Sequence, residues 1–237
     1  MDIWFVRHAQ TTANASGTCQ GQSEWPLNDI GKEEAFQTGF RLFKHRFKEI
    51  WCCDLERSRH TVQGILAENL VQEVPTTFDK ILRGQFSGTQ EGKPTKEIYE
   101  MMAKFEGVRR DFRIPGGEAN SEICNRALTF LRDIYARRIG KSRERSEEWD
   151  VFEQYLVGTH GRFIMSMYEI LGDYDGVERP EAFKESANCS LHNMRLYCKE
   201  TGGFCREDCP SNTNGKDLGC MKWDIVLNGD VTHLTDE

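Results

Sequence analysis

The chain has 237 residues, a length that fits one large domain or two small ones. Hydrophobic residues make up 38% of it and charged residues 29%, a composition that excludes extensive intrinsic disorder. The formal net charge of −7 argues against a general nucleic-acid binder, because phosphate contacts along a nucleic acid require an excess of basic residues.

The N-terminal apolar run at Asp2–Val6 is too short for a signal peptide or a membrane-spanning helix. Nine cysteines is an odd number, and Cys52 and Cys53 are adjacent inside a strand-like run, which is a poor arrangement for a disulfide framework. We therefore expect a reduced protein of the cytoplasm with no membrane contact.

Strand-like apolar runs alternate along the chain with segments in which apolar residues have helical spacing. In chain order, the predicted elements are a strand at Asp2–Val6, a helix at Asp29–Phe47, a strand at Glu49–Cys53, helices at Arg57–Leu70, Lys93–Arg110 and Glu118–Arg138, a strand at Gln154–Thr159, a helix at Phe163–Leu171, and strands at Ser190–Cys198 and Met221–Leu227. This alternation predicts an α/β fold, with a mostly parallel central sheet covered by helices on both faces.

No linker divides the chain, so we expect residues 1–237 to form a single domain. The segment 199–219 is rich in Gly, Asn, Lys and Asp and is longer than a hairpin connection needs, which predicts an exposed insertion between two strands. Four cysteines lie in or beside it: Cys198, Cys205, Cys209 and Cys220. They could bind structural zinc, but they lack a Cys-x-x-Cys pair, so we favour a reduced loop and predict no metal site.

Three strand-like runs end in charged or imidazole side chains. Arg7 and His8 follow the first strand, Arg57 lies four residues after the second, and His160 follows the strand that ends at Thr159. Ligands of open α/β sheets bind beyond the carboxyl ends of the strands, so these side chains are candidates for one site.

This set of side chains suits a phosphoryl group. Arginine guanidinium groups bind phosphate oxygens in a bidentate way, and a neutral imidazole is a good nucleophile toward phosphorus. Arginines nearby keep the imidazole neutral, and a second histidine can donate a hydrogen bond to an oxygen that gains charge in the transition state. If Arg7 and His8 stood alone, the simpler interpretation would be two residues of an ordinary loop.

The order and spacing of the motifs resemble the histidine phosphatase superfamily, also called phosphoglycerate mutase-like. The matching segments are Arg7-His8-Ala9, with Ala where the family usually has Gly, then Asn14, Gln20-Gly21, Pro26-Leu27-Asn28-Asp29-Ile30-Gly31, Cys53-Asp54-Leu55-Glu56-Arg57, Pro115-Gly116-Gly117-Glu118 and Thr159-His160-Gly161. Within the superfamily, the chain looks most like the fructose-2,6-bisphosphatase branch.

The resemblance implies that His8 becomes phosphorylated and that Arg7, Arg57 and His160 form the phosphate pocket. It further implies that substrate is bound by Asn14 and Gln20 at the rim and by Gly161 after the second histidine. No cofactor is implied, and the expected partner is a phosphorylated small molecule. The sequence leaves protein partners and oligomeric state open.

One departure from the family concerns the proton donor. The family has Leu-x-Glu where this chain has Leu82-Arg83-Gly84, and the residue after the second histidine, an Asp in the acid-phosphatase branch, is Gly161. A missing general acid typically lowers a rate about 10²–10⁴-fold. Glu91 and Glu118 are the nearest replacements, although a carboxylate at a helix start is the ordinary explanation for both, and Glu91 is the possible proton donor.

Other basic residues could bind a second phosphate or a carboxylate. Arg83 is the strongest candidate, because it neighbours the vacated acid position. The others are expected mostly on solvated helix faces: Lys93, Lys96, Arg109, Arg110 and Arg113.

Two functions therefore compete. One is a phosphatase that hydrolyses small phosphorylated metabolites, including sugar bisphosphates such as fructose 2,6-bisphosphate, through a phosphohistidine. The other is an impaired relative that binds a phosphorylated ligand or a protein partner, and it is favoured by Gly84. A phosphoglycerate mutase ranks last, because it needs the same missing Glu.

Overall fold

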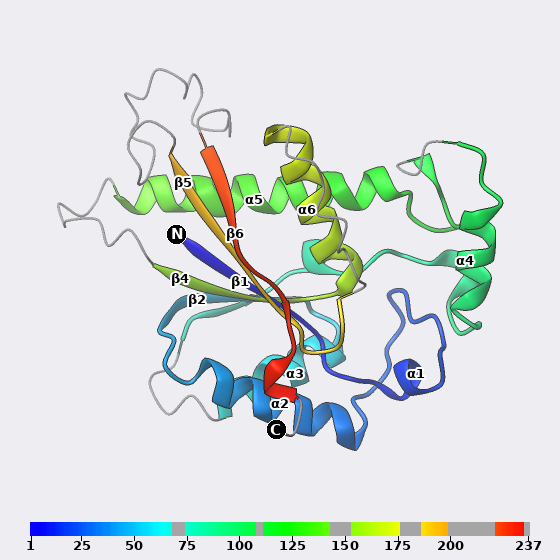
Figure 1. The fold of residues 1–237 in the computed structure, drawn as a ribbon, viewed down its shortest axis with the longest axis horizontal. Coiled ribbons are helices and arrows are strands. Elements are labelled where there is room, and N and C mark those ends of the chain that lie inside the picture. Colours follow the sequence, from blue (N-terminus) through cyan, green and yellow to red (C-terminus); the bar gives the residue numbers. More distant parts are fainter. Residues whose placement is uncertain (68–73, 108–110, 143–152, 176–185, 199–220, 235–237) are drawn as a thin grey trace.

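The computed structural model describes residues 1–67, 74–107, 111–142, 153–175, 186–198 and 221–234. Its core is a six-stranded sheet in the order β3-β2-β4-β1-β5-β6 (Figure 1). The strands are β1 (Asp2–Arg7), β2 (Phe47–Cys52), β3 (Thr76–Phe78), β4 (Gln154–Thr159), β5 (Leu191–Cys198) and β6 (Met221–Asp230). The first four in the sheet order run parallel, whereas β5 and β6 are antiparallel to their neighbours.

Helices cover both faces of this sheet (Figure 1). They are α1 (Thr12–Ala15), α2 (Asp29–Leu42), α3 (Glu56–Ala67), α4 (Lys96–Ala103), α5 (Asn120–Ser142) and α6 (Gly161–Asp175), with short 3-10 turns at Lys80–Leu82, Gly88–Gln90 and Thr232–Leu234. Helices α5 and α6 lie on one face, and α2 and α3 pack together on the other.

Alternation along β1 builds a separate apolar layer on each face of the sheet. Ile3 and Phe5 belong to a buried cluster with residues of α5 and α6, whereas Trp4 and Val6 belong to one with residues of α2 and α3. A strand whose side chains are apolar on both faces is typical of a central parallel strand. The two layers hold the carboxyl end of β1 rigidly between them.

The predicted α/β class, with a mostly parallel sheet and helices on both faces, is confirmed. Several boundaries were wrong. The helix predicted at Asp29–Phe47 ends at Leu42, because Phe47 already pairs with β4 as part of β2. The helix predicted at Lys93–Arg110 is the short α4, and the strand β3 was missed because it has only three residues. The predicted insertion 199–219 lies outside the described residues, as do Cys205, Cys209 and Cys220, and a single domain remains a proposal.

The start of α2 is packed directly against the loop that follows β1. Asn28 caps the helix by accepting a hydrogen bond from Gly31 N at 2.8 Å, and its own backbone N donates to Gln10 O at 3.1 Å. A Cβ atom at Gly31 would lie 2.0 Å from Gln10 O, so this position requires glycine. The Pro-Leu-Asn-x-x-Gly motif therefore fixes the loop beside His8.

Two negative observations concern the described residues. None of their helices combines the length and the apolar character needed to cross a membrane. Their His, Cys, Asp and Glu side chains form no group of three or more that could hold a metal ion.

Candidate active site

The carboxyl ends of three adjacent parallel strands meet at one edge of the sheet. Arg7 of β1 pairs with Thr159 of β4, and Gly158 of β4 pairs with Cys52 of β2. The residues that follow these strands therefore come together. The rings of His8 and His160 contact edge to face, with centroids 5.1 Å apart and an interplanar angle of 60°.

The backbone around His8 fixes the orientation of its imidazole. His8 N donates to Thr159 O at 2.9 Å, and Asn188 Nδ2 donates to His8 O at 2.9 Å. The ring nitrogen Nδ1 lies 2.8 Å from Ala9 O. Because a carbonyl oxygen can only accept, Nδ1 carries the proton and the lone pair is on Nε2. This is the tautomer that a nucleophilic histidine needs.

His160 is buried between two groups that can donate to its Nε2. Cys53 Sγ lies 3.1 Å from this nitrogen and Ser58 Oγ lies 3.3 Å from it. Burial raises the pKa of the Cys53 thiol to about 11, so the thiol keeps its hydrogen. A hydrogen bond from either group to Nε2 leaves Nδ1 as the N–H of His160, available to a bound oxygen.

Arg57 is the most deeply buried arginine of the site, with 1% of its surface exposed. Its Nη1 donates to Ser23 O at 2.7 Å and its Nη2 donates to Gly21 O at 2.8 Å. Its buried Nε has no hydrogen-bond partner among the described residues, so one donor of this guanidinium is unsatisfied. Burial lowers the pKa of Arg57 to about 10, and the group is still charged at neutral pH.

Two further arginines reach the same cavity. Arg7 follows the buried part of β1 and donates from Nη1 to Ser186 O. Arg162, in the first turn of α6, pairs with Glu169, with Nη1 2.9 Å from Oε1. Arg7 and Arg57 place positive charge beside the two histidines, whereas Glu169 offsets the charge of Arg162.

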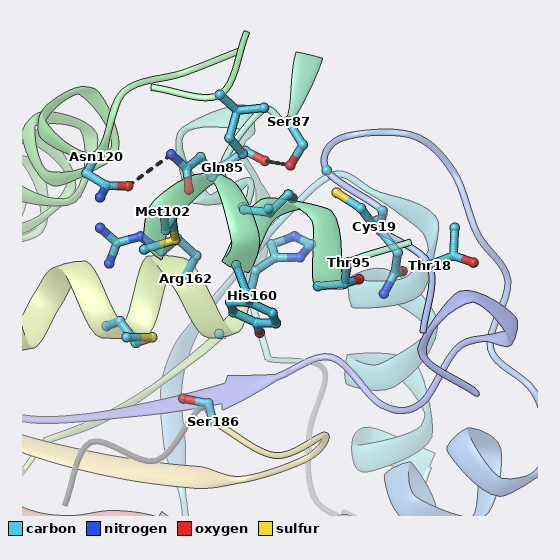
Figure 2. Close-up of a pocket in the computed structure, with 18 of the residues that line it drawn as sticks. Thr18, Cys19, Gln85, Ser87, Thr95, Met102, Asn120, His160, Arg162 and Ser186 are labelled. Carbon is cyan, nitrogen blue, oxygen red and sulfur yellow. Dashed lines mark hydrogen bonds between the residues drawn. The ribbon is translucent and has the colours of Figure 1, made fainter. Parts of the chain in front are cut away.

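The cavity has a volume of about 710 Å³ and opens above the strand ends (Figure 2). It is lined by most of the residues that the sequence predicted: Arg7, His8, Asn14, Gln20, Arg57, His160 and Gly161. The Asn14 amide is oriented by its Oδ1, which accepts from Thr11 N at 3.1 Å and from Asn188 Nδ2 at 3.3 Å. Its NH₂ end is therefore the one left for a ligand.

Arg83, predicted to bind substrate, does not line the cavity. Its guanidinium forms a bidentate ion pair with Asp54, with Nε–Oδ1 and Nη2–Oδ2 distances of 2.7 Å each. Arg83 is adjacent to Gly84 in sequence, but its side chain extends to the loop after β2. Arg83 therefore positions that loop.

The two glutamates considered as replacement acids do not line the cavity either. Glu91 Oε1 accepts from Gln22 N at 2.8 Å and from Ser87 N at 3.2 Å, so this carboxylate fastens two loops together. Glu118 pairs with Arg126 at 2.7 Å. The structure therefore gives no support to Glu91 as the proton donor.

Gly84 lies directly against the second histidine. A Cβ atom at this position would lie 3.1 Å from His160 Cγ and 3.5 Å from His160 Nδ1. The position of the family's usual acid is thus beside the reacting groups, but it carries no side chain. Among the described residues that line the cavity there is no Asp or Glu.

Several residues of the site were missed by sequence reasoning. Cys53 and Ser58 were read only as parts of a motif, although they contact His160. Arg162 follows His160-Gly161 directly and could have been found by its place at a helix start. The apolar wall of the cavity comes largely from α4, and a pattern of apolar spacing cannot tell a ligand-facing helix from a core-facing one.

Burial and positive charge keep both imidazoles neutral. Burial, followed by the charges of Arg57 and Arg7, lowers the pKa of His8 well below its ordinary value. The pKa of His160 is lowered by burial first and then by Arg57, His8 and Arg7. A neutral His8 is the nucleophilic form, and it persists at pH values where an exposed imidazole would be protonated.

We therefore expect His8 and His160 of the free protein to be neutral at pH 6. An ordinary imidazole is about three quarters protonated there, because its pKa is about 6.5. Nitrogen NMR of the histidine rings between pH 5 and 8, with His8→Asn and His160→Asn used for assignment, measures both titrations. A midpoint at or above pH 6.5 for His8 would contradict the electrostatics of this cavity.

Residues 3–202 match the model of the histidine phosphatase superfamily (branch 1). The phosphoglycerate mutase-like protein 4 of Arabidopsis thaliana is 30% identical over 243 residues, covering 99% of this chain and 87% of that protein. The fructose-2,6-bisphosphatase TIGAR of Mus musculus is 30% identical over 169 residues, covering 66% of this chain and 62% of that protein.

Solved structures share the fold. A mycobacterial glucosyl-3-phosphoglycerate phosphatase, solved with VO3, superposes with a TM-score of 0.70 at 18% identity, covering 96% of this chain and 98% of that one. A phosphoglycerate mutase from Bacillus anthracis gives a TM-score of 0.71 at 17% identity, covering 99% of this chain and 95% of that one. At these identities the likeness concerns the fold alone.

Proposed function

The chain belongs to the histidine phosphatase superfamily, and we propose that it hydrolyses phosphate monoesters through a phosphohistidine formed on His8. The observation that carries this proposal is the pairing of a buried, correctly oriented His8 with Arg7, Arg57 and His160 around one cavity. Its Nδ1–H is held by Ala9 O, which leaves Nε2 as the attacking atom.

The proposed reaction has two steps. In the first, His8 Nε2 forms a bond to phosphorus while the bond to the leaving oxygen breaks, and the electron pair departs with that oxygen. The guanidinium groups of Arg7 and Arg57 stabilise the equatorial oxygens, and the N–H of His160 donates to one of them. In the second step, the oxygen of water forms a bond to phosphorus and its proton passes to solvent, while the N–P bond breaks and its electron pair returns to Nε2.

The substrate class is a phosphorylated small molecule, because a cavity of about 710 Å³ has room for one and arginines in its lining carry positive charge. Relatives named as a fructose-2,6-bisphosphatase and as a metal-independent phosphoserine phosphatase support this class. Fructose 2,6-bisphosphate is one candidate substrate. A cytoplasmic location and the absence of a nucleic-acid partner, both expected from the sequence, remain part of the proposal.

A non-catalytic alternative is favoured by one specific observation. Gly84 occupies the position of the usual acid, and the described part of the cavity lining contains no carboxyl group. Such a protein would bind a phosphorylated ligand in the same pocket without turning it over. Turnover of an activated ester distinguishes the two functions, because a good leaving group departs without a proton donor.

Two arginine variants test the proposal. Arg57→Met should lower kcat/KM for p-nitrophenyl phosphate about 10²–10³-fold, because it removes a buried charge and a donor from the transition state. Arg83→Met, the same substitution at an arginine outside the cavity, should lower kcat/KM by a much smaller factor, because Arg83 acts on the site only through the loop that holds Asp54.

Circular dichroism of both variants separates misfolding from lost catalysis, and Arg57→Lys offers a second variant that keeps the charge but loses the planar guanidinium. Equal losses in folded Arg57→Met and Arg83→Met would contradict the proposed phosphate pocket. No turnover by wild type above that of a buffer blank would favour the non-catalytic alternative.

A further inference from the structure

The cavity is larger and more apolar than a phosphate requires. Its floor is formed by the strand-end residues Arg7, His8, Arg57 and His160. The wall away from the strands is formed by side chains with little or no polar character: Ala103, Ile98, Ile114, Met102, Met165, Phe105, Phe112 and Tyr99. A bound molecule that fills this volume therefore contacts the floor with one end and the apolar wall with the other.

Helix α4 supplies much of this wall. Ile98 and Met102 are four residues apart and so lie on the same side of the helix, and both line the cavity. Met102 is labelled in Figure 2. No residue of α4 is fully buried in the protein, and Tyr99 is 48% exposed. The apolar side of α4 is thus available to a ligand that reaches beyond the phosphate site.

The described residues of the outer cavity offer few basic groups for a second phosphate. Of the basic residues that the sequence suggested for this purpose, Lys93, Lys96 and Arg113 do not line it, and Arg109 and Arg110 lie outside the described residues. Arg113 instead donates to Gly117 O and to Glu122. Arg162 does line the cavity, but its guanidinium is already paired with Glu169.

The lack of a side chain at Gly84 also bears on which leaving groups can depart, and this argument does not depend on the apolar wall. A sugar leaves as an alkoxide, which is a much stronger base than the phenolate released from an aryl ester, since a phenol has a pKa of about 10. With Gly84 beside His160, the described lining offers no carboxyl group to protonate the departing oxygen. The described lining therefore favours a leaving group that is stable as an anion.

Both observations point to the same chemistry. Resting on the proposed phosphatase function, we propose that this site is built for aryl phosphates, in which the phosphate is esterified to an aromatic hydroxyl. The phosphate binds to the floor and the ring lies against Ile98 and Met102. Attack by His8 breaks the bond between phosphorus and the aryl oxygen, and the phenolate leaves with the electron pair and takes a proton from solvent.

The test compares substrates that separate the two contributions. Phenyl phosphate and 1-naphthyl phosphate have leaving groups of similar acidity but different apolar area. Acetyl phosphate has an activated leaving group with little apolar area, and fructose 1,6-bisphosphate has a polar alkoxide leaving group. We expect kcat/KM to be highest for the naphthyl ester and lowest for the sugar bisphosphate, by at least about 10²-fold.

Two neighbouring methionines provide a matched pair of variants. Met102→Gln removes apolar surface from the wall at nearly constant shape and should lower the ratio of kcat/KM for the naphthyl over the phenyl ester about three- to tenfold. Met101→Gln changes the same helix outside the cavity and should leave that ratio unchanged.

The outcomes distinguish this inference from the function on which it rests. No catalysed hydrolysis of acetyl phosphate or of either aryl ester would refute the phosphatase function itself. Hydrolysis of acetyl phosphate together with a preference for the sugar bisphosphate over both aryl esters would leave the function standing and overturn the inference. The same holds if Met101→Gln and Met102→Gln change the naphthyl-to-phenyl ratio equally.

Discussion

His8→Asn should abolish formation of a covalent phosphoenzyme and lower turnover of p-nitrophenyl phosphate by on the order of 10⁴-fold or more, the usual cost of losing a nucleophile. The Asn amide can still donate to Ala9 O, so the loop keeps its hydrogen bond while the attacking nitrogen is lost. No other described residue of the cavity places an oriented imidazole beside both Arg7 and Arg57 except His160, whose Nε2 faces Cys53.

The measurement uses rapid quenching in alkali, in which phosphohistidine is stable, followed by detection of the labelled protein. His60→Asn is the matched control, because His60 is exposed on α3 and contacts only Glu56 among the described ion pairs. It should form phosphoenzyme like wild type. If His8→Asn is labelled as strongly as wild type, another residue is the nucleophile.

Gly84→Glu should increase turnover of alkyl phosphates, by up to the factor of about 10²–10⁴ that a general acid provides. The new carboxyl would start from the backbone beside His160 and could reach the leaving oxygen. The gain will not be full, because the added Cβ lies 3.1 Å from His160 Cγ and the ring must move by a few tenths of an ångström. His160 is buried against Cys53 and Ser58, so that movement is resisted.

Gly84→Gln separates the steric cost from the chemistry, since it has the same Cβ and nearly the same size but no acidic proton. Comparing the Glu and Gln variants on glycerol phosphate and on p-nitrophenyl phosphate isolates the acid. We expect Glu to exceed Gln at least about tenfold on the alkyl ester and to differ little on the aryl ester. Equal rates for the two variants on glycerol phosphate would show that the acid comes from elsewhere, and Glu91→Gln would be the next variant to measure.

The floor of the site could be read from the sequence because it depends on local rules. Parallel strands end at one edge of a sheet, so residues that follow β1, β2 and β4 had to meet there. Asn14 and Gln20 could be placed only through the resemblance to a family, since nothing in their own spacing indicates a cavity. Gly31 shows why such a motif exists, because its missing Cβ allows α2 to contact Gln10.

Two features could not be predicted from local pattern: where long side chains point, and where short elements begin and end. Arg83 pairs with Asp54, which is 29 residues away in sequence. The spacing of neighbouring residues does not indicate a contact between positions so far apart. Helix α4 was overextended at both ends for a different reason: the apolar residues from Lys93 to Arg110 fit helical spacing, but the chain turns before and after Lys96–Ala103. The three-residue strand β3 is too short to give a period.

The floor and the wall of the cavity differ in how substitutions in them affect the protein. The floor is made by strand ends between two buried apolar layers, so substitutions there endanger the fold and the chemistry together. The wall includes a helix with no fully buried residue, where substitutions cost little stability. Substitutions in α4 should therefore alter which ester is preferred, while the residues of the phosphate pocket stay unchanged.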